Sequence, residues 1–148
     1  MTNKKIEVAI AILYQDGKFL LQLRDDIPGI PYPGQWAFFG GHIEVGETPE
    51  VAIKRELEEE ISYHPSIVTK FCCYEDLKVI RHVFYAELKV DIKDLVLKEG
   101  WDLGLLTPEE IRLGSCYSEK AGMVRSLGSP HQRILLDFME AMERLALH

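Results

Sequence analysis

Residues 49–61 constrain the fold most, because strong start and stop signals enclose a single helix. Thr48 can cap the helix with its side-chain oxygen, and Pro49 suits the first helical position. Glu50 in the first turn favours the positive end of the helix dipole. Pro65 follows soon after and cannot continue a helix. The sequence therefore predicts a helix over residues 49–61.

Segments typical of β-strands lie on both sides of this helix. Ile6–Tyr14 and Lys18–Arg24 flank an Asp16-Gly17 turn and predict a β-hairpin. Residues 25–35 hold three prolines and two glycines and predict a stiff loop. Further strands are expected over residues 36–39, 67–74 and 79–90, and another is expected to begin at Leu105. Helices are expected to begin at Thr107 and to span residues 130–147. Strands flanked by helices, without a linker or repeat, predict one α/β domain over residues 1–148, an α/β/α sandwich with a central mixed sheet.

Charge and composition exclude several classes of function. The net charge of −7 argues against binding to a nucleic acid polymer, because such binding depends on Lys and Arg. No apolar run approaches the roughly 20 residues that a membrane helix needs. The apolar run 6–10 is short and contains an acid, unlike a signal peptide. Adjacent Cys72 and Cys73 suit a reducing compartment, where we expect them to be buried, so a cytoplasmic location is expected.

Three glutamates of the predicted helix share one face. At about 100° per residue, Glu56, Glu59 and Glu60 fall within an arc of about 100°, whereas Glu58 points to nearly the opposite side. Like charges at this spacing repel each other unless a hard cation such as Mg²⁺ binds them. A solvated helix face is the alternative interpretation of the three acids.

The spacing around these acids resembles the Nudix box. The matching residues are Gly41, Glu47, Arg55-Glu56-Leu57 and Glu59-Glu60. Five residues separate Gly41 from Glu47, seven separate Glu47 from Arg55, and one separates Leu57 from Glu59. A chance alignment of six of these seven positions would occur in roughly one of 10,000 such sequences. Ser62 departs from the pattern, because the family usually has glycine at the helix exit. The resemblance extends over most of residues 6–113 and implies a Nudix-type α/β/α sandwich.

The resemblance also implies a metal site that uses Mg²⁺, or Mn²⁺ as a substitute. Its ligands would be the carbonyl oxygen of Gly40 and the carboxylates of Glu56, Glu59, Glu60 and Glu99. Glu99 precedes the strand expected from Leu105, where related triphosphate hydrolases carry a further acid, and a solvated loop glutamate is the alternative. Glu75 and Asp76 are the other candidates for this ligand.

The same resemblance implies how the site would act. Arg55 would orient carboxylates through its planar guanidinium, with Glu47 paired near it. Either Glu59 or Glu56 would accept the proton of the attacking water. Catalysis would therefore depend on Glu59, Glu56 and Arg55.

Four residues are candidates for substrate binding. Arg24 ends the second predicted strand, and Tyr32 and Trp36 could stack on a nucleobase. Packing in the core is the alternative for both aromatic residues, and it is the one that typical burial favours. His131 could contact a ligand at the start of the C-terminal helix, although a surface position there is the preferred interpretation.

The resulting hypothesis is an enzyme that hydrolyses a nucleoside diphosphate linked to another group, with a small nucleotide as substrate. A nucleoside triphosphate, cleaved to a monophosphate and pyrophosphate, is the leading candidate. ADP-ribose hydrolases of the family often carry a proline where this chain has Lys78 and Val79. The alternatives are a pyrophosphatase of ADP-ribose or another nucleotide derivative, a non-catalytic nucleotide-binding regulator and a plain acidic interaction domain. The sequence does not decide between a monomer and a homodimer.

Overall fold

The computed structural model describes residues 4–146, which divide into two compact units. Unit 1 contains residues 4–14 and 39–98, and unit 2 contains residues 15–38 and 99–146. Each unit is therefore built from two segments that are separated in sequence. The single-domain organisation stays a prediction.

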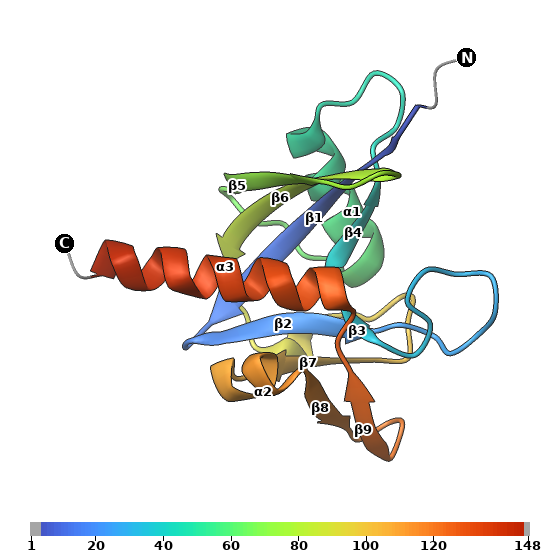
Figure 1. Ribbon diagram of the computed structural model, residues 1–148, viewed down its shortest axis with the longest axis vertical. Coiled ribbons are helices and arrows are strands. Elements are labelled where there is room, and N and C mark those ends of the chain that lie inside the picture. The colour runs from blue at the N-terminus through green and yellow to red at the C-terminus, as the bar shows by residue number, and fades with distance from the viewer. Residues whose placement is uncertain (1–3, 147–148) are drawn as a thin grey trace. The chain divides into compact units, whose positions relative to one another are not determined.

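Unit 1 contains a mixed β-sheet (Figure 1). Strand β1 (Ile6–Gln15) pairs with β4 (Phe39–His42) on one side and with β6 (Val79–Glu87) on the other, and β5 (Thr69–Glu75) pairs with β6. The β1–β6 pair is parallel and the other two pairs are antiparallel. The predicted mixed sheet is thus confirmed. The predicted strand 79–90 was too long, because a 3₁₀ helix, η1 (Ile92–Asp94), soon follows β6.

Helix α1 (Pro49–Ile61) has the predicted bounds. The Thr48 side chain accepts a hydrogen bond from the Val51 N–H at 3.2 Å, so the predicted cap is formed. The helix buries one face completely, with the side chains of Ala52, Ile53, Leu57 and Ile61. Burial of each larger aliphatic side chain contributes about 1.5–3 kcal/mol to folding. This face anchors the helix, and its glutamates lie outside it, except for buried Glu60.

Ser62 ends α1 in a left-handed conformation, with φ 53° and ψ 39°. Its N–H donates to the Glu58 carbonyl, and the Tyr63 N–H donates to the Leu57 carbonyl at 3.3 Å. These two bonds satisfy carbonyls that a helix end otherwise leaves without partners. Ser62 therefore makes the helix exit that glycine usually provides, at some conformational cost.

Part of unit 2 is a group of antiparallel strands built around β2 (Figure 1). Strand β2 (Lys18–Leu23) pairs with β3 (Trp36–Ala37) and with β7 (Asp102–Leu106). The predicted strand 36–39 is divided at Phe38, which lies between β3 and β4. At the predicted turn, Asp16 and Gly17 have φ of 52° and 75°, as a type I′ turn requires.

The C-terminal part of unit 2 contains two helices and a hairpin. Helix α2 (Pro108–Leu113) starts with a complete capping box between Thr107 and Glu110. Strands β8 (Ser115–Ser118) and β9 (Met123–Ser126) form an antiparallel pair that the sequence did not predict. Helix α3 (Ser129–Ala146) confirms the predicted C-terminal helix, whose expected last residue, Leu147, lies outside the described residues.

The prediction that Cys72 and Cys73 are buried was wrong. Both are exposed, because they lie on β5, the outermost strand of the sheet in unit 1. Cys116 is partly buried, and this burial together with a hydrogen bond to Glu110 raises the pKa of its thiol to about 12. No helix within residues 4–146 is long and apolar enough to cross a membrane.

Candidate active site

Arg55 is the centre of a cluster of carboxylates in unit 1. Its Nε donates to Glu47 Oε2 at 2.6 Å, and one terminal nitrogen donates to Glu47 Oε1 at 3.0 Å. The other terminal nitrogen contacts Glu56 at 3.0 Å, Glu59 at 3.2 Å and Glu44 at 3.7 Å. One guanidinium therefore contacts four carboxylates, which we call the Arg55 cluster.

The cluster changes the proton affinity of its members. Hydrogen bonds from Arg55 hold the pKa of Glu47 below its usual range, and the bond to Glu47 raises the pKa of Arg55. Burial raises the pKa of Glu56, against the opposing effect of Arg55. The hydrogen bonds from Arg55 thus keep the Glu47 carboxylate charged, whereas burial makes the charged form of Glu56 less favourable.

The predicted pairing of Glu47 with Arg55 is present, and it connects the loop before α1 to the helix. The same guanidinium donates to the His42 carbonyl at 3.0 Å, at the end of β4. Sequence reasoning missed this carbonyl and the Glu44 carboxylate. The signal for Glu44 was its acidic side chain in the short loop between Gly41 and Glu47.

Both glycines of β4 lie at close approaches, Gly41 against a carboxylate of α1 and Gly40 against the neighbouring strand β1. The Gly40 N–H donates to Glu60 Oε1 at 2.8 Å, and the Glu60 residue is only 8% exposed. A Cβ on Gly41 would lie 2.6 Å from Glu56 Oε1, and one on Gly40 would lie 2.1 Å from the Ala9 carbonyl oxygen. Side chains at either position would displace the backbone or the carboxylate. The glycine at position 41 of the Nudix box thus has a steric cause here.

The donor atoms of this region suit Mg²⁺, which prefers oxygen ligands and usually binds carboxylates. In the structure, Glu56 and Glu59 are turned toward Arg55, and Glu60 is turned toward Gly40. Within residues 4–146, no group of three His, Cys, Asp or Glu side chains is arranged to hold a metal ion. The ligand set of Gly40, Glu56, Glu59 and Glu60 therefore stays a prediction.

Glu99 follows a segment that is attached to the C-terminal turn of α1. The Val96 N–H donates to the Ile61 carbonyl at 3.4 Å, and the Lys98 N–H donates to the Glu60 carbonyl at 3.0 Å. Lys98 Nζ also donates to the Glu58 carbonyl at 3.3 Å. Glu99 itself is exposed and begins the second segment of unit 2. Its role as a metal ligand stays a prediction.

The other two candidate acids have roles at the β5–β6 turn. Asp76 accepts from the N–H groups of Lys78 and Val79 at 2.8 Å each and from Arg81 at 2.9 Å. These bonds, led by the one from Arg81, hold its pKa well below the usual range. Glu75 forms an ion pair with Lys5. Both carboxylates are thus used within the sheet.

The predicted substrate-binding residues all belong to unit 2. Trp36 is 1% exposed and its Nε1 donates to the Cys116 carbonyl at 3.1 Å, which makes it a core residue without an open face for a nucleobase. Tyr32 is partly buried, in a left-handed conformation with φ 52°. Arg24 Nε is buried without a hydrogen-bond partner among the described residues.

The preferred surface interpretation of His131 was wrong, because this residue is buried. Its Nδ1 accepts a hydrogen bond from the Phe38 N–H at 3.4 Å. The Tyr32 ring meets the imidazole edge to face at a centroid distance of 5.1 Å. His131 and Tyr32 therefore lie together in unit 2, as part of one packed group.

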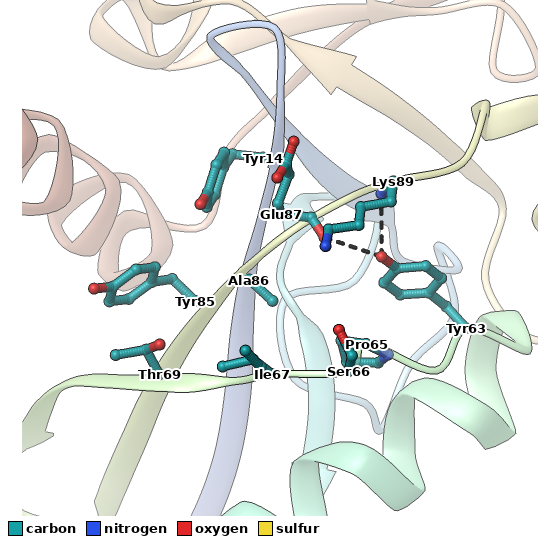
Figure 2. Close-up of a pocket in the computed structure, with 10 residues that line it drawn as sticks. All are labelled: Tyr14, Tyr63, Pro65, Ser66, Ile67, Thr69, Tyr85, Ala86, Glu87 and Lys89. Atoms are coloured by element: carbon teal, nitrogen blue, oxygen red, sulfur yellow. Dashed lines mark hydrogen bonds between the residues drawn. The ribbon is translucent and has the colours of Figure 1, made fainter.

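A pocket of about 180 Å³ lies elsewhere in unit 1 and shares no residue with the Arg55 cluster (Figure 2). Tyr14, Tyr63 and Tyr85 contribute aromatic rings to its wall. The Tyr63 hydroxyl donates to the Glu87 carbonyl at 2.9 Å and accepts from the Lys89 N–H at 3.1 Å, so this ring is held firmly. None of the predicted site residues lines this pocket.

Comparison with known proteins identifies the family. The model of the NUDIX domain family matches residues 4–127. This match covers most of the chain, so the chain belongs to the NUDIX domain family, as the resemblance predicted.

Curated relatives match a shorter part of the chain. Nucleoside triphosphatase NudI of Escherichia coli K12 is 41% identical over 54 residues, which are 36% of this chain and 38% of that protein. Nucleoside triphosphatase NudI of Salmonella arizonae is 35% identical over 74 residues, covering 49% of this chain and 52% of that protein. The chain thus spans about half the length, or less, of these relatives.

Solved structures share the fold over nearly the whole chain. The MutT protein of Methanosarcina mazei matches with a TM-score of 0.68 at 22% identity, over 99% of this chain and 98% of its own. The NUDIX domain of Shewanella oneidensis NrtR, solved with ADP ribose, matches with a TM-score of 0.70 at 19% identity, over 97% and 90%. These similarities confirm the predicted α/β fold class of the Nudix type.

Proposed function

We propose that this chain is a Mg²⁺-dependent hydrolase that cleaves a phosphoanhydride bond in a nucleoside diphosphate linked to another group. The leading substrate is a nucleoside triphosphate, which would give a monophosphate and pyrophosphate. The observation that carries this proposal is the Arg55 cluster, in which one guanidinium faces four carboxylates. Such an excess of negative charge favours the binding of a cation.

The residues of α1 have separate roles in this proposal. Arg55 holds the Glu56 and Glu59 carboxylates in place, and Gly41 leaves room for the Glu56 carboxylate. Glu56, Glu59, Glu60, the Gly40 carbonyl and Glu99 would hold Mg²⁺. When bound, Mg²⁺ would neutralise phosphate oxygens and increase the acidity of water.

A carboxylate must accept the proton when water attacks phosphorus and the pyrophosphate oxygen leaves. The Glu59 side chain is 57% exposed and that of Glu56 is 15% exposed. Because water reaches Glu59 more easily, we assign the proton acceptor to Glu59 and a ligand role to Glu56. Arg55 contacts both carboxylates and would fix the distance between them.

The substrate class is supported by the partial similarity to nucleoside triphosphatases. Lys78 and Val79, in place of the proline common in ADP-ribose hydrolases, further disfavour ADP-ribose. Arg24 keeps its proposed role as a contact for a phosphate or base oxygen, because the residue as a whole is only partly buried. Tyr32 is the aromatic candidate for base stacking that keeps partial exposure.

Release of pyrophosphate and phosphate over a panel of nucleoside triphosphates and ADP-ribose, with and without Mg²⁺, tests the proposal. We expect pyrophosphate from at least one triphosphate, only when Mg²⁺ is present. Faster cleavage of ADP-ribose would replace the proposed substrate class but keep the reaction. Tight nucleotide binding without turnover would instead indicate a regulator and would contradict the proposed activity.

A further inference from the structure

Three side chains on neighbouring strands of unit 1 form a continuous chain of polar contacts outside the Arg55 cluster. The Sγ atom of Cys73 on β5 lies 3.3 Å from Nδ1 of His82 on β6. Nε2 of the same imidazole lies 2.9 Å from Oε1 of Glu7 on β1. A thiol, an imidazole and a carboxylate in this order form the arrangement that activates a nucleophile through a base.

The register of the sheet produces this arrangement. Cys73 is the direct cross-strand partner of His82, so their side chains share one face. Lys70 pairs with Phe84, and uninterrupted pairing from there would place Cys72 opposite His82. The bulge between Lys70 and Cys72 shifts the register by one residue and brings Cys73 to that position instead.

Exposure of the three groups suits a reaction with a small molecule. Cys73 is exposed, the His82 side chain is 14% exposed, and the Glu7 side chain is 54% exposed. When Nε2–H donates to Glu7, Nδ1 keeps its lone pair and can accept the thiol proton. The resulting imidazolium would be stabilised by the Glu7 carboxylate.

We propose that Cys73 is a reactive thiol that is modified by low-molecular-weight disulfides and other soft electrophiles. The proton of the Cys73 thiol passes to His82 Nδ1, and the sulfur attacks one sulfur of the disulfide. A new S–S bond forms while the original one breaks, and the leaving thiolate takes up a proton. Cys73 is thereby oxidised to a mixed disulfide that carries one half of the small molecule, and the other half is released as a thiol.

Cys72 is a matched control within the same strand. It is also exposed, but its Sγ contacts the backbone carbonyl of Cys73 at 3.5 Å and not an imidazole. The two thiols therefore share sequence context and exposure class, and they differ in the contact with His82. A difference in their reactivity measures the effect of this contact.

The test uses variants of the chain that each keep one cysteine: Cys72→Ser with Cys116→Ser, and Cys73→Ser with Cys116→Ser. Their rates of alkylation by iodoacetamide are measured at pH 7 by mass spectrometry. An ordinary thiol is only a few per cent thiolate at pH 7, so we expect Cys73 to react about tenfold faster than Cys72. His82→Gln should reduce the Cys73 rate to that of Cys72, and Glu7→Gln should reduce it by less.

Oxidised glutathione provides the second measurement, with the expected product carrying one glutathionyl group on Cys73. Equal rates at Cys72 and Cys73 would overturn the proposal. This comparison leaves His82 in place, so it does not depend on whether the His82→Gln variant folds. An unchanged Cys73 rate in a folded His82→Gln variant would overturn it as well. Because no residue of the Arg55 cluster is altered, the outcome is independent of whether the chain hydrolyses nucleotides.

Discussion

Arg55 and Arg81 both bind carboxylates in unit 1, but the balance of charge around them differs. Arg55 contacts four carboxylates from α1 and from the loop before it. The Asp76 carboxylate beside Arg81, in contrast, also accepts two backbone N–H groups of the β5–β6 turn. At the first site, four carboxylates share one guanidinium. At the second site, the Asp76 carboxylate accepts hydrogen bonds from two backbone N–H groups and from Arg81.

This difference separates two uses of an ion pair. A carboxylate that accepts several hydrogen bonds is stabilised where it is and contributes to a turn. Several carboxylates around one guanidinium repel one another and become more stable when a further cation binds. An excess of acid, and not the presence of an ion pair, therefore marks the candidate active site.

The largest expected effect is the loss of turnover in Glu60→Gln and Glu56→Gln. Each change removes a charge from the acid-rich site, and we expect kcat/KM on the best nucleotide to fall roughly 10²- to 10⁴-fold. The glutamine carbonyl at position 60 can still accept from the Gly40 N–H, so the fold should be kept.

Glu58→Gln is the control for these variants. Glu58 pairs with His64 and lies outside the Arg55 cluster, so its replacement should change kcat/KM little. Circular dichroism on all three variants checks the fold. Near wild-type turnover in Glu60→Gln, or a large loss in Glu58→Gln, would contradict the assignment of the acids.

Replacing each arginine by lysine compares the two ion-pair sites directly. Lysine cannot form the two parallel bonds that Arg55 forms with Glu47, so Arg55→Lys should lower kcat/KM about 10- to 100-fold. Arg81→Lys should lower the melting temperature and leave kcat/KM nearly unchanged. Steady-state kinetics and thermal unfolding of both variants give the comparison, which fails if Arg81→Lys is the less active of the two.

Glu99→Ala tests whether the excess of acid extends beyond α1. We expect kcat to fall about tenfold and the Mg²⁺ concentration for half-maximal rate to rise, because one ligand would be lost. Glu75→Ala and Asp76→Ala should show neither change, since both carboxylates are engaged within the sheet. Titration of the rate with Mg²⁺ for the three variants decides which acid is the further metal ligand. Normal activity in Glu99→Ala together with reduced activity in Glu75→Ala would assign that ligand to Glu75 instead of Glu99.

Asp76→Asn should make stability less dependent on pH. The folded-state pKa of Asp76 lies below its unfolded value of about 3.9, so its stabilising effect is present above that value. The effect is lost as the pH falls through the folded-state pKa. We expect a lower melting temperature than wild type at pH 7 and a smaller difference at pH 2.5. A difference that grows toward acid pH would show that the charge of Asp76 destabilises the turn.

Ser62→Gly should have the smallest effect, with opposite sign. Glycine adopts the left-handed conformation of this position without the steric cost that serine carries, so stability should rise by about 0.5–1 kcal/mol. Urea denaturation measures the change, and kcat/KM should stay unchanged. A loss of stability would mean that the Ser62 side chain contributes more than its backbone costs.

The acid-rich helix could be predicted closely from sequence, because its signals are local. Thr48 and Pro49 determine where α1 starts, and the angular spacing of the glutamates follows from helix geometry. The pairing of Glu47 with Arg55 came from the family pattern, and the contact is present. What the pattern could not show is that Glu56 and Glu59 would turn toward Arg55, because side-chain direction depends on three-dimensional neighbours.

Features that depend on distant segments were predicted less well. The hairpin of β8 and β9 was missed, because its turn residues Glu119–Gly122 lack an Asn-Gly or Asp-Gly pair. His131 was expected at the surface from its place at a helix start, but it is buried against Tyr32 and Phe38. Cys72 and Cys73 were expected to be buried from residue type alone, but no residue of the outermost strand β5 is buried.

The bulge in β5 has a further consequence for how copies of this chain behave at high concentration. The outer side of β5 pairs with no other strand among residues 4–146, and such a side can recruit a strand from another molecule. The bulge interrupts the even spacing of N–H and carbonyl groups that this recruitment needs, and exposed Lys70 and Glu75 place charges beside it. The same irregularity that brings Cys73 to His82 therefore also makes β5 a poorer template for pairing with a strand of another copy.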